Sequence, residues 1–364
     1  MSRLGYIAPF PPLSDQPFPP ARNHSKWKEI YRSHDEWVSE HWPYPNEQKR
    51  SRLPATKLAG LTTWAAPFTP YDRVIWAARM TGIFILVDDL LNSHNRDPCL
   101  VAGFQSVVDG NGPLHATNEA EIAYDLVFQA VKHDCHPQTY AQLVRLTKEW
   151  WDANADPGPA ATFSDLDHYL LDRGVGTGVF MINAVLRYAA DINLADSTIN
   201  HPLVRRCERI AAEYGILAQD LQASAYEKAP PSPISQDILS ILSTQYQLTA
   251  PQARALLQNK MAERERDFIS AGQEVYADPE LGKDPQVRRW IACLPYGMGG
   301  YLAWCHETTR FNIGNIDIEP SIPFALEVVP FDDPSETLEC SYLIHFFALV
   351  VMELIRVRFK YAYP

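Results

Sequence analysis

Apolar residues recur along most of the chain at intervals of three and four, the spacing of one face of an α-helix. This pattern predicts helices over about residues 24–42, 46–58, 71–95, 98–109, 118–134, 137–154, 164–187, 201–228, 249–276, 285–309 and 336–360. Thr249 and Gln252 have the spacing of a capping box at the start of one helix. No run of alternating strands and no internal repeat is found. We therefore expect an all-α fold, a single helical bundle around a central cavity.

Prolines and glycines suggest how the chain is divided. Residues 1–23 carry many prolines and no periodicity, so we expect a proline-rich N-terminal arm. Residues 24–364 are expected to form one α-helical domain, in which a proline-broken connector, 312–334, precedes the last helix. Glycines at 174, 176 and 178 should interrupt the helix over 164–187.

The most informative stretch is IFILVDDLLNSHNRD, residues 83–97. Asp88 and Asp89 follow an unbroken apolar run, so these carboxylates should emerge from a buried wall, where they need partners. In a helix Asp88 and Asn92 share a face, while Asp89 points about 100° away. Such a group of hard oxygens suits Mg²⁺. The alternative is an N-cap or a solvated helix end.

A second group lies in LAQDLQASAYEKA. Asp220, Ser224 and Glu227 stand at i, i+4 and i+7 and so share one helical stripe, which predicts a second hard-oxygen metal site. Lys228, beside them, is able to reach a phosphate oxygen. The alternative is that Glu227 and Lys228 are ordinary surface residues near a helix end.

Two arginines complete the set. Arg173 directly precedes glycines that should break a helix, and a guanidinium there can bind a phosphate group through two parallel hydrogen bonds. A glycine-rich nucleotide loop is the competing interpretation, but the glycines follow a helical pattern rather than a strand. Arg310-Phe311 follows Trp304 by six residues, and an exposed helix-end arginine is the simpler interpretation of it.

Composition narrows the classes of function. The 364 residues are 46% hydrophobic, enough for a large core in one domain, and the net charge of −12 argues against a nucleic-acid partner. Six cysteines without a C-x-x-C pair indicate reduced thiols in a cytoplasmic protein rather than a zinc site. We see no secretory signal, and the longest apolar run near the C-terminus, 346–352, is too short to span a membrane.

Taken together, these four motifs resemble those of class I terpene synthases. DDLLN is similar to their DDxx(D/E) motif, residues 219–227 to their second metal motif ND(L/I/V)xSxxxE, Arg173 to their diphosphate-sensing arginine, and Arg310-Phe311 to their late Arg-Tyr pair. The resemblance covers about residues 60–311 and depends on the order of four individually degenerate motifs.

The chain departs from the family pattern at several positions. Asn92 replaces an acidic residue, and Phe311 lacks the hydroxyl of the family's tyrosine. In the register set by Arg173, Gln219 and Ala223 fall where the family has metal ligands, and only Glu227 matches. A shift of one residue restores Asp220 and Ser224 but puts Lys228 in the last place. We favour Asp220, Ser224 and Glu227, because Ala223 cannot bind a metal.

The resemblance implies ionisation of a prenyl diphosphate and cyclisation of the carbocation. It implies Mg²⁺, three ions with substrate bound, held by the two motifs, and diphosphate binding by Arg173, Lys228 and Arg310. Phe84 and Trp304 are expected to line the apolar cavity, with plain core packing as their alternative. The length suggests a sesquiterpene cyclase that uses farnesyl diphosphate, with a humulene-type product and a homodimer left open.

Three alternatives remain at this point. A prenyltransferase shares the fold and the metal chemistry, but the second aspartate-rich motif that such enzymes usually carry is not found. A catalytically silent helical protein that binds an isoprenoid or a partner would explain Gln219 and Ala223. The third is an unrelated helical scaffold in which the four matches are coincidental.

Overall fold

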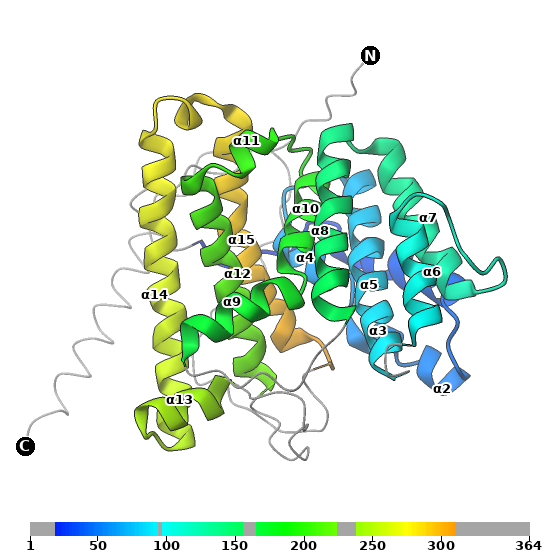
Figure 1. The fold of residues 1–364 in the computed structure, drawn as a ribbon, viewed down its shortest axis with the longest axis horizontal. Helices are drawn as coiled ribbons and strands as arrows, with labels where there is room; N and C mark the ends of the chain where they lie inside the picture. The colour runs from blue at the N-terminus through cyan, green and yellow to red at the C-terminus, as the bar shows by residue number, and fades with distance from the viewer. Residues whose placement is uncertain (1–18, 94–96, 156–164, 224–237, 311–364) are drawn as a thin grey trace, which may run out of the picture. The chain divides into compact units, whose positions relative to one another are not determined.

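The computed structural model describes residues 19–93, 97–155, 165–223 and 238–310, and every regular element in these ranges is a helix (Figure 1). The all-α prediction is therefore confirmed for this part of the chain. Contacts divide the chain into two units, Met1–Glu327 and Val328–Pro364, and all described residues belong to the first. Most of the expected arm, the connector 312–334 and the helix 336–360 lie outside the described residues, so the domain limits stay a prediction.

The helices follow the apolar periodicity closely in most of the chain. Their bounds are α1 Trp27–His41, α2 Glu47–Arg50, α3 Leu53–Thr56, α4 Gly60–Ala65, α5 Tyr71–Ser93, α6 Pro98–Val108, α7 Glu119–Asp134, α8 Pro137–Ala155, α9 Leu166–Gly176, α10 Val179–Ala189, α11 Asp196–Ile199, α12 Pro202–Ala223, α13 Ile238–Tyr246, α14 Ala250–Ala277 and α15 Pro285–Glu307. The predicted capping box is present, since the Thr249 N–H donates to the Gln252 side chain at 2.9 Å. The short helices α4, α11 and α13 were not predicted.

The helix expected over 46–58 is wrong, because α2 and α3 are separate single turns. Lys57 has a φ of 48°, a left-handed conformation that ends α3. The hydroxyl groups of Thr308 and Thr309 donate to the carbonyls of Thr56 and Ala55. A segment about 250 residues away in sequence thus binds the carbonyl groups at this helix end.

The predicted glycine interruption is confirmed at Gly178, whereas Gly174 and Gly176 belong to α9. Gly178 has a φ of 72°, which only glycine adopts freely, and it separates the two helices. A Cβ at Gly178 would lie 3.2 Å from the Trp150 ring of α8, so the break also allows close packing. The chain therefore changes direction three to five residues after Arg173.

Two hydrophobic cores form the interior of the described part. One is built mainly by α12, α14 and α15 and the other by α5, α6, α7, α8 and α10. Figure 1 shows these two groups side by side, with α4 and α9 between them. Ile182 of α10 packs against both cores. A binding site can therefore form in the space between the two groups of helices.

Helix α4 is completely buried and is joined to the end of α15 by one carboxylate. Glu307 accepts hydrogen bonds from Trp64 Nε1 at 2.7 Å, from Lys57 Nζ at 2.7 Å and from the Tyr31 hydroxyl at 3.1 Å. A Cβ on Gly60 would clash with the Tyr31 hydroxyl and the Trp304 ring, so glycine lets these elements approach closely. The position of Arg310, three residues later, is set by this junction.

Candidate active site

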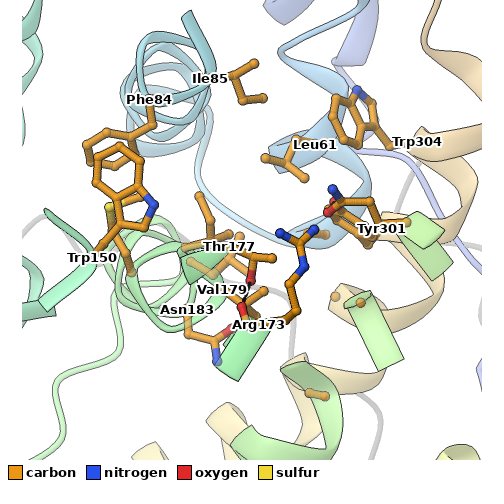
Figure 2. Close-up of a pocket in the computed structure, with 18 of the residues that line it drawn as sticks. Leu61, Phe84, Ile85, Trp150, Arg173, Thr177, Val179, Asn183, Tyr301 and Trp304 are labelled. Carbon is orange, nitrogen blue, oxygen red and sulfur yellow. Dashed lines mark hydrogen bonds between the residues drawn. The ribbon is translucent and has the colours of Figure 1, made fainter. Parts of the chain in front are cut away.

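A cavity of about 460 Å³ lies between the two cores. Its wall is formed by residues from seven helices and by Thr177 and Arg310. The helical residues include Leu61 and Ala65 of α4, Phe84, Ile85 and Asp88 of α5, Trp150 and Asn154 of α8, Arg173 of α9, Val179, Ile182, Asn183 and Leu186 of α10, Ala211, Gly215 and Gln219 of α12, and Leu294, Gly297, Met298, Tyr301 and Trp304 of α15. Figure 2 shows Phe84 and Trp150 on one side and Tyr301 and Trp304 on the other, with Arg173 between them.

Helical spacing explains why these residues share one space. The lining residues of α12 recur every four residues, from Ala211 through Gly215 to Gln219, and those of α15 fall at i, i+3, i+4 and i+7. Eight residues of helix correspond to about 12 Å. The cavity therefore has an apolar depth, reached by Ala211, and a polar rim at the level of Gln219.

We use the name polar rim for Asp88, Arg173, Gln219, Tyr301 and Arg310. Burial raises the pKa of the Tyr301 phenol, which stays protonated and donates to Gln219 Oε1 at 3.0 Å. Asp88 raises the pKa of Arg310, so the two lie within electrostatic reach of each other. The sequence-predicted residues Asp88, Arg173 and Arg310 are thus brought to one end of one cavity.

The two adjacent aspartates of α5 have different surroundings. Asp88 lines the cavity, whereas Asp89 forms a bidentate ion pair with Arg310, with distances of 2.6 and 2.7 Å between the oxygens and Nη1 and Nη2. This pair is partly exposed. Although burial lowers the pKa of Arg310, the hydrogen bonds to Asp89 raise it above its ordinary value. Asn92 belongs to α5, but its side chain lies outside the described set.

Arg173 lies on the last turns of α9, and its guanidinium points into the cavity (Figure 2). Burial opposes its positive charge, but Tyr169 and Asp220 outweigh that effect and raise its pKa. Arg173 therefore presents a fixed positive charge to the cavity.

The second motif has the same division between neighbouring residues. Gln219 lines the cavity, whereas Asp220 is only 8% exposed and accepts a hydrogen bond from the Tyr169 hydroxyl at 2.6 Å. Ser224, Glu227 and Lys228 lie outside the described residues. Within the described ranges no group of three His, Cys, Asp or Glu side chains is placed to hold a metal ion. A metal site at Asp220, Ser224 and Glu227 stays a prediction.

Phe84 and Trp304 line the cavity and also pack in the core. Phe84 makes edge-to-face contacts with Tyr124 and Phe128, at centroid distances of 5.8 and 6.0 Å. Trp304 Nε1 donates to the Lys57 carbonyl at 2.7 Å. These contacts fix the ring orientations, so the functional and structural interpretations of the two residues are compatible.

Several lining residues were missed by the sequence analysis. Tyr301 lies one turn before Trp304, and the i, i+3, i+4 rule applied to Trp304 would have found it. Asn183 is the only polar side chain among the cavity-lining residues of α10, whose other lining positions are apolar. Leu61 carries no signal, because its short helix has no periodic pattern long enough to recognise.

The metal-binding C-terminal model of terpene synthase family 2 matches residues 80–267, just over half of the chain. The chain belongs to terpene synthase family 2. The match includes Asp88, Arg173 and the 219–227 stretch and ends before Arg310. The class I terpene synthase resemblance is thereby confirmed at the level of the family.

Two similar proteins are named for different products. The chain is 31% identical to cycloaraneosene synthase from Sordaria araneosa over 150 residues, which are 40% of this chain and 39% of the relative. It is 21% identical to an aristolochene synthase from Penicillium rubens over 296 residues, which are 79% of this chain and 85% of the relative. The first match thus spans about two fifths of that relative's length.

Solved terpene synthases share the fold. The structure of aristolochene synthase from Penicillium roqueforti superposes with a TM-score of 0.70 and 19% identity, covering 80% of this chain and 99% of that one. A linalool/nerolidol synthase from Streptomyces clavuligerus gives a TM-score of 0.68 with 15% identity, covering 79% of this chain and 99% of that one. Among the described residues, no helix combines the length and hydropathy needed to cross a membrane.

Proposed function

We propose that this terpene synthase ionises farnesyl diphosphate and cyclises the farnesyl cation to a sesquiterpene, with Mg²⁺ as cofactor. The observation that carries the proposal is a single cavity whose rim presents Asp88, Arg173 and Arg310 and whose depth is apolar. An allylic diphosphate has the same division between a charged head and a hydrocarbon tail.

The charges of the polar rim suit the leaving group. Diphosphate leaves only if its developing negative charge is stabilised, and fixed cations in a partly buried site do this without rearrangement. Arg173 and Arg310 are both partly buried, and carboxylates or phenols near each hold its charge in place. We propose that both bind the diphosphate, together with Lys228.

Hard oxygens at the rim fit a Mg²⁺ ion. Asp88 is the carboxylate on the cavity wall, and Mg²⁺ is commonly bound by one or two carboxylates, waters and substrate phosphates. We propose that Asp88, with Asp89 and Asn92, holds one side, and that Asp220, Ser224 and Glu227 hold the other; three ions with substrate bound is the expected number. When bound, the ions supply Lewis-acid stabilisation of the diphosphate oxygens.

The apolar depth protects and guides a cation. Leu61, Ile182 and Leu186 exclude bulk water, while the faces of Phe84 and Trp304 can stabilise positive charge. The fixed ring orientations described above mean that the cation meets a preformed surface. The conformation that the prenyl substrate adopts in the cavity before ionisation therefore selects which of its carbons form bonds.

A C15 substrate and a humulene-type carbon skeleton are the specific parts of the proposal. The relatives are named for different products, aristolochene and cycloaraneosene among them, so the family alone does not choose the skeleton. A cavity of about 460 Å³ lies within the range of about 300–1,000 Å³ of small-molecule sites.

The alternative is a silent isoprenoid-binding protein, and one observation favours it. On α12 the side chain that faces the cavity is the neutral amide of Gln219, not a carboxylate. Such a protein would bind a prenyl diphosphate without cleaving it, so no inorganic diphosphate would be released.

Incubation of the full chain with C10, C15 and C20 prenyl diphosphates, with and without Mg²⁺, separates these functions. We expect Mg²⁺-dependent diphosphate release with the C15 substrate and a cyclic C15 product by gas chromatography with mass spectrometry. Longer linear prenyl diphosphates after addition of isopentenyl diphosphate would identify a prenyltransferase. Tight binding without diphosphate release would identify the silent protein.

A further inference from the structure

The wall formed by α10 contains one polar side chain whose role in cyclisation is unexplained. Val179, Ile182, Asn183 and Leu186 line the cavity at i, i+3, i+4 and i+7, and three of the four are hydrocarbon. Asn183 is the exception. It lies one turn beyond Val179 on the cavity-lining face of α10, and Figure 2 shows it below Val179.

The amide of Asn183 is buried and incompletely bonded. Asn183 is 6% exposed, and its Nδ2 has no hydrogen-bond partner among the residues that the structure describes. A buried amide left without a partner is costly, and native structures usually satisfy such a group with protein or an ordered water.

Other polar groups that line the cavity differ from Asn183. Trp150 Nε1 and Asn154 Nδ2 both donate to the Gly176 carbonyl at 3.1 Å, and the Thr177 hydroxyl donates to the Arg173 carbonyl at 2.8 Å. These side chains are bonded within the protein and support the α9–α10 break. Asn183 Nδ2, in contrast, is a donor on the wall of α10 that a molecule inside the cavity can bind.

The tail of a prenyl substrate cannot accept this hydrogen bond, because it consists of carbon and hydrogen. The partner must therefore be a hydrogen-bond acceptor that is small enough to share the cavity with the prenyl chain, and water is the smallest such molecule. We propose that Asn183 holds one water molecule in the cavity during turnover, and that this water adds to the carbocation, so that the main product is a terpene alcohol. This inference rests on the proposed cyclase function.

The chemistry balances without any oxidant or reductant. A lone pair of the water oxygen forms the new C–O bond at the cationic carbon, and no carbon–carbon bond is broken in that step. The resulting oxonium ion loses one proton to the diphosphate anion that was released on ionisation. The product keeps the carbon skeleton of the cyclised cation and gains one hydroxyl group.

The test measures the oxygenated share of the product in H₂¹⁸O. The full wild-type chain is incubated with farnesyl diphosphate and Mg²⁺, diphosphate release is counted, and the volatile products are analysed by mass spectrometry. We expect an alcohol as the main product, heavier by two mass units in labelled water. Labelled water distinguishes addition within the cyclisation from oxygen carried over from the substrate.

Asn183→Leu then removes the amide at nearly constant volume. We expect the ratio of alcohol to hydrocarbon, normalised to diphosphate released, to fall by about 10-fold or more, the usual effect of losing one well-placed hydrogen bond. A matched asparagine-to-leucine change outside the cavity should leave that ratio within about twofold. Asn200→Leu, at an exposed position, controls for the substitution type.

Each outcome decides the matter. Diphosphate release with only hydrocarbons and no ¹⁸O in wild type overturns the water proposal and leaves the cyclase function intact, as does an unchanged alcohol share in Asn183→Leu. No release from any prenyl diphosphate overturns both. If Asn183→Leu fails to fold, Asn183→Ala is measured in its place, and the labelling of wild type still gives a result.

Discussion

Helices α5 and α12 face the same cavity with adjacent pairs of polar residues, and the two pairs are used differently. On α5, Asp88 lines the cavity while Asp89 binds Arg310. On α12, Gln219 lines the cavity while Asp220 binds the Tyr169 hydroxyl. In each pair, one residue faces the cavity and its neighbour, about 100° round the helix, bonds to another part of the protein.

The difference lies in the chemistry of the residue that faces inward. It is a carboxylate on α5 and a neutral amide on α12, so the described rim is acidic on one side only. On α12, the negative charge proposed for metal binding therefore comes from Asp220 and Glu227 rather than from the residue that lines the cavity.

Replacing Asp88 gives the largest expected effect. Asp88→Ala removes the acidic side chain from the cavity wall, and diphosphate release should fall by about 100- to 1,000-fold, as for loss of other preorganised electrostatic groups. The measurement is the initial rate with farnesyl diphosphate and Mg²⁺. Asp72→Ala, an exposed carboxylate in the first turn of the same helix, is the control. Near wild-type turnover of Asp88→Ala would remove Asp88 from the mechanism.

The α12 side is tested by comparing two substitutions. If Glu227 holds a metal ion and Gln219 only shapes the wall, Glu227→Ala should reduce the rate by about 100-fold and Gln219→Ala by less than about 5-fold. Both rates are measured over a Mg²⁺ titration, in which Glu227→Ala should also need more Mg²⁺. The opposite ranking would support the register that places Gln219 among the ligands.

The Asp89–Arg310 pair is expected to act as a unit. Asp89→Asn frees Arg310 from its fixed position and Arg310→Gln removes its charge, so each should lower the rate by about 10-fold or more. Residues of one ion pair are not additive, and the double variant should be little worse than Arg310→Gln. The rates are measured as kcat/KM. If the fold-loss of the double variant equals the product of the two single fold-losses, the two residues act separately.

The Tyr169–Asp220 contact should affect stability more than rate. Tyr169→Phe removes a hydrogen bond to a buried carboxylate, and the free energy of unfolding in urea should fall by about 1.5–3 kcal/mol. Tyr246→Phe, at an exposed tyrosine, should leave it unchanged. A normal unfolding curve with a much slower reaction would instead assign Tyr169 to the site.

Long periodic helices and the order of the motifs could be predicted from the sequence. The apolar spacing placed α5, α14 and α15 within a few residues, and the glycines located the break after Arg173. Local signals are sufficient there, because each helix carries several turns of evidence.

The contacts that depend on distant parts of the chain could not be predicted in this way. The end of α3 depends on Thr308 and Thr309, and the position of Asp89 depends on Arg310. The inward direction of Gln219 depends on how α12 is rotated against α15. The motif comparison favoured Asp220 because Ala223 cannot bind a metal, and this choice stays a prediction. The rotation of α12 about its axis is set by packing, which the type of ligand does not reveal.

The hydrogen bonds of Glu307 limit how far the protein can be shortened at its N-terminus without displacing Arg310. Its hydroxyl donor, Tyr31, lies 276 residues earlier in the sequence, on the first helix. Trimming the protein past this tyrosine would therefore loosen the far end of α15 and displace Arg310, although no residue near the cavity had been removed. The first helix therefore helps to hold Arg310 in its place at the cavity.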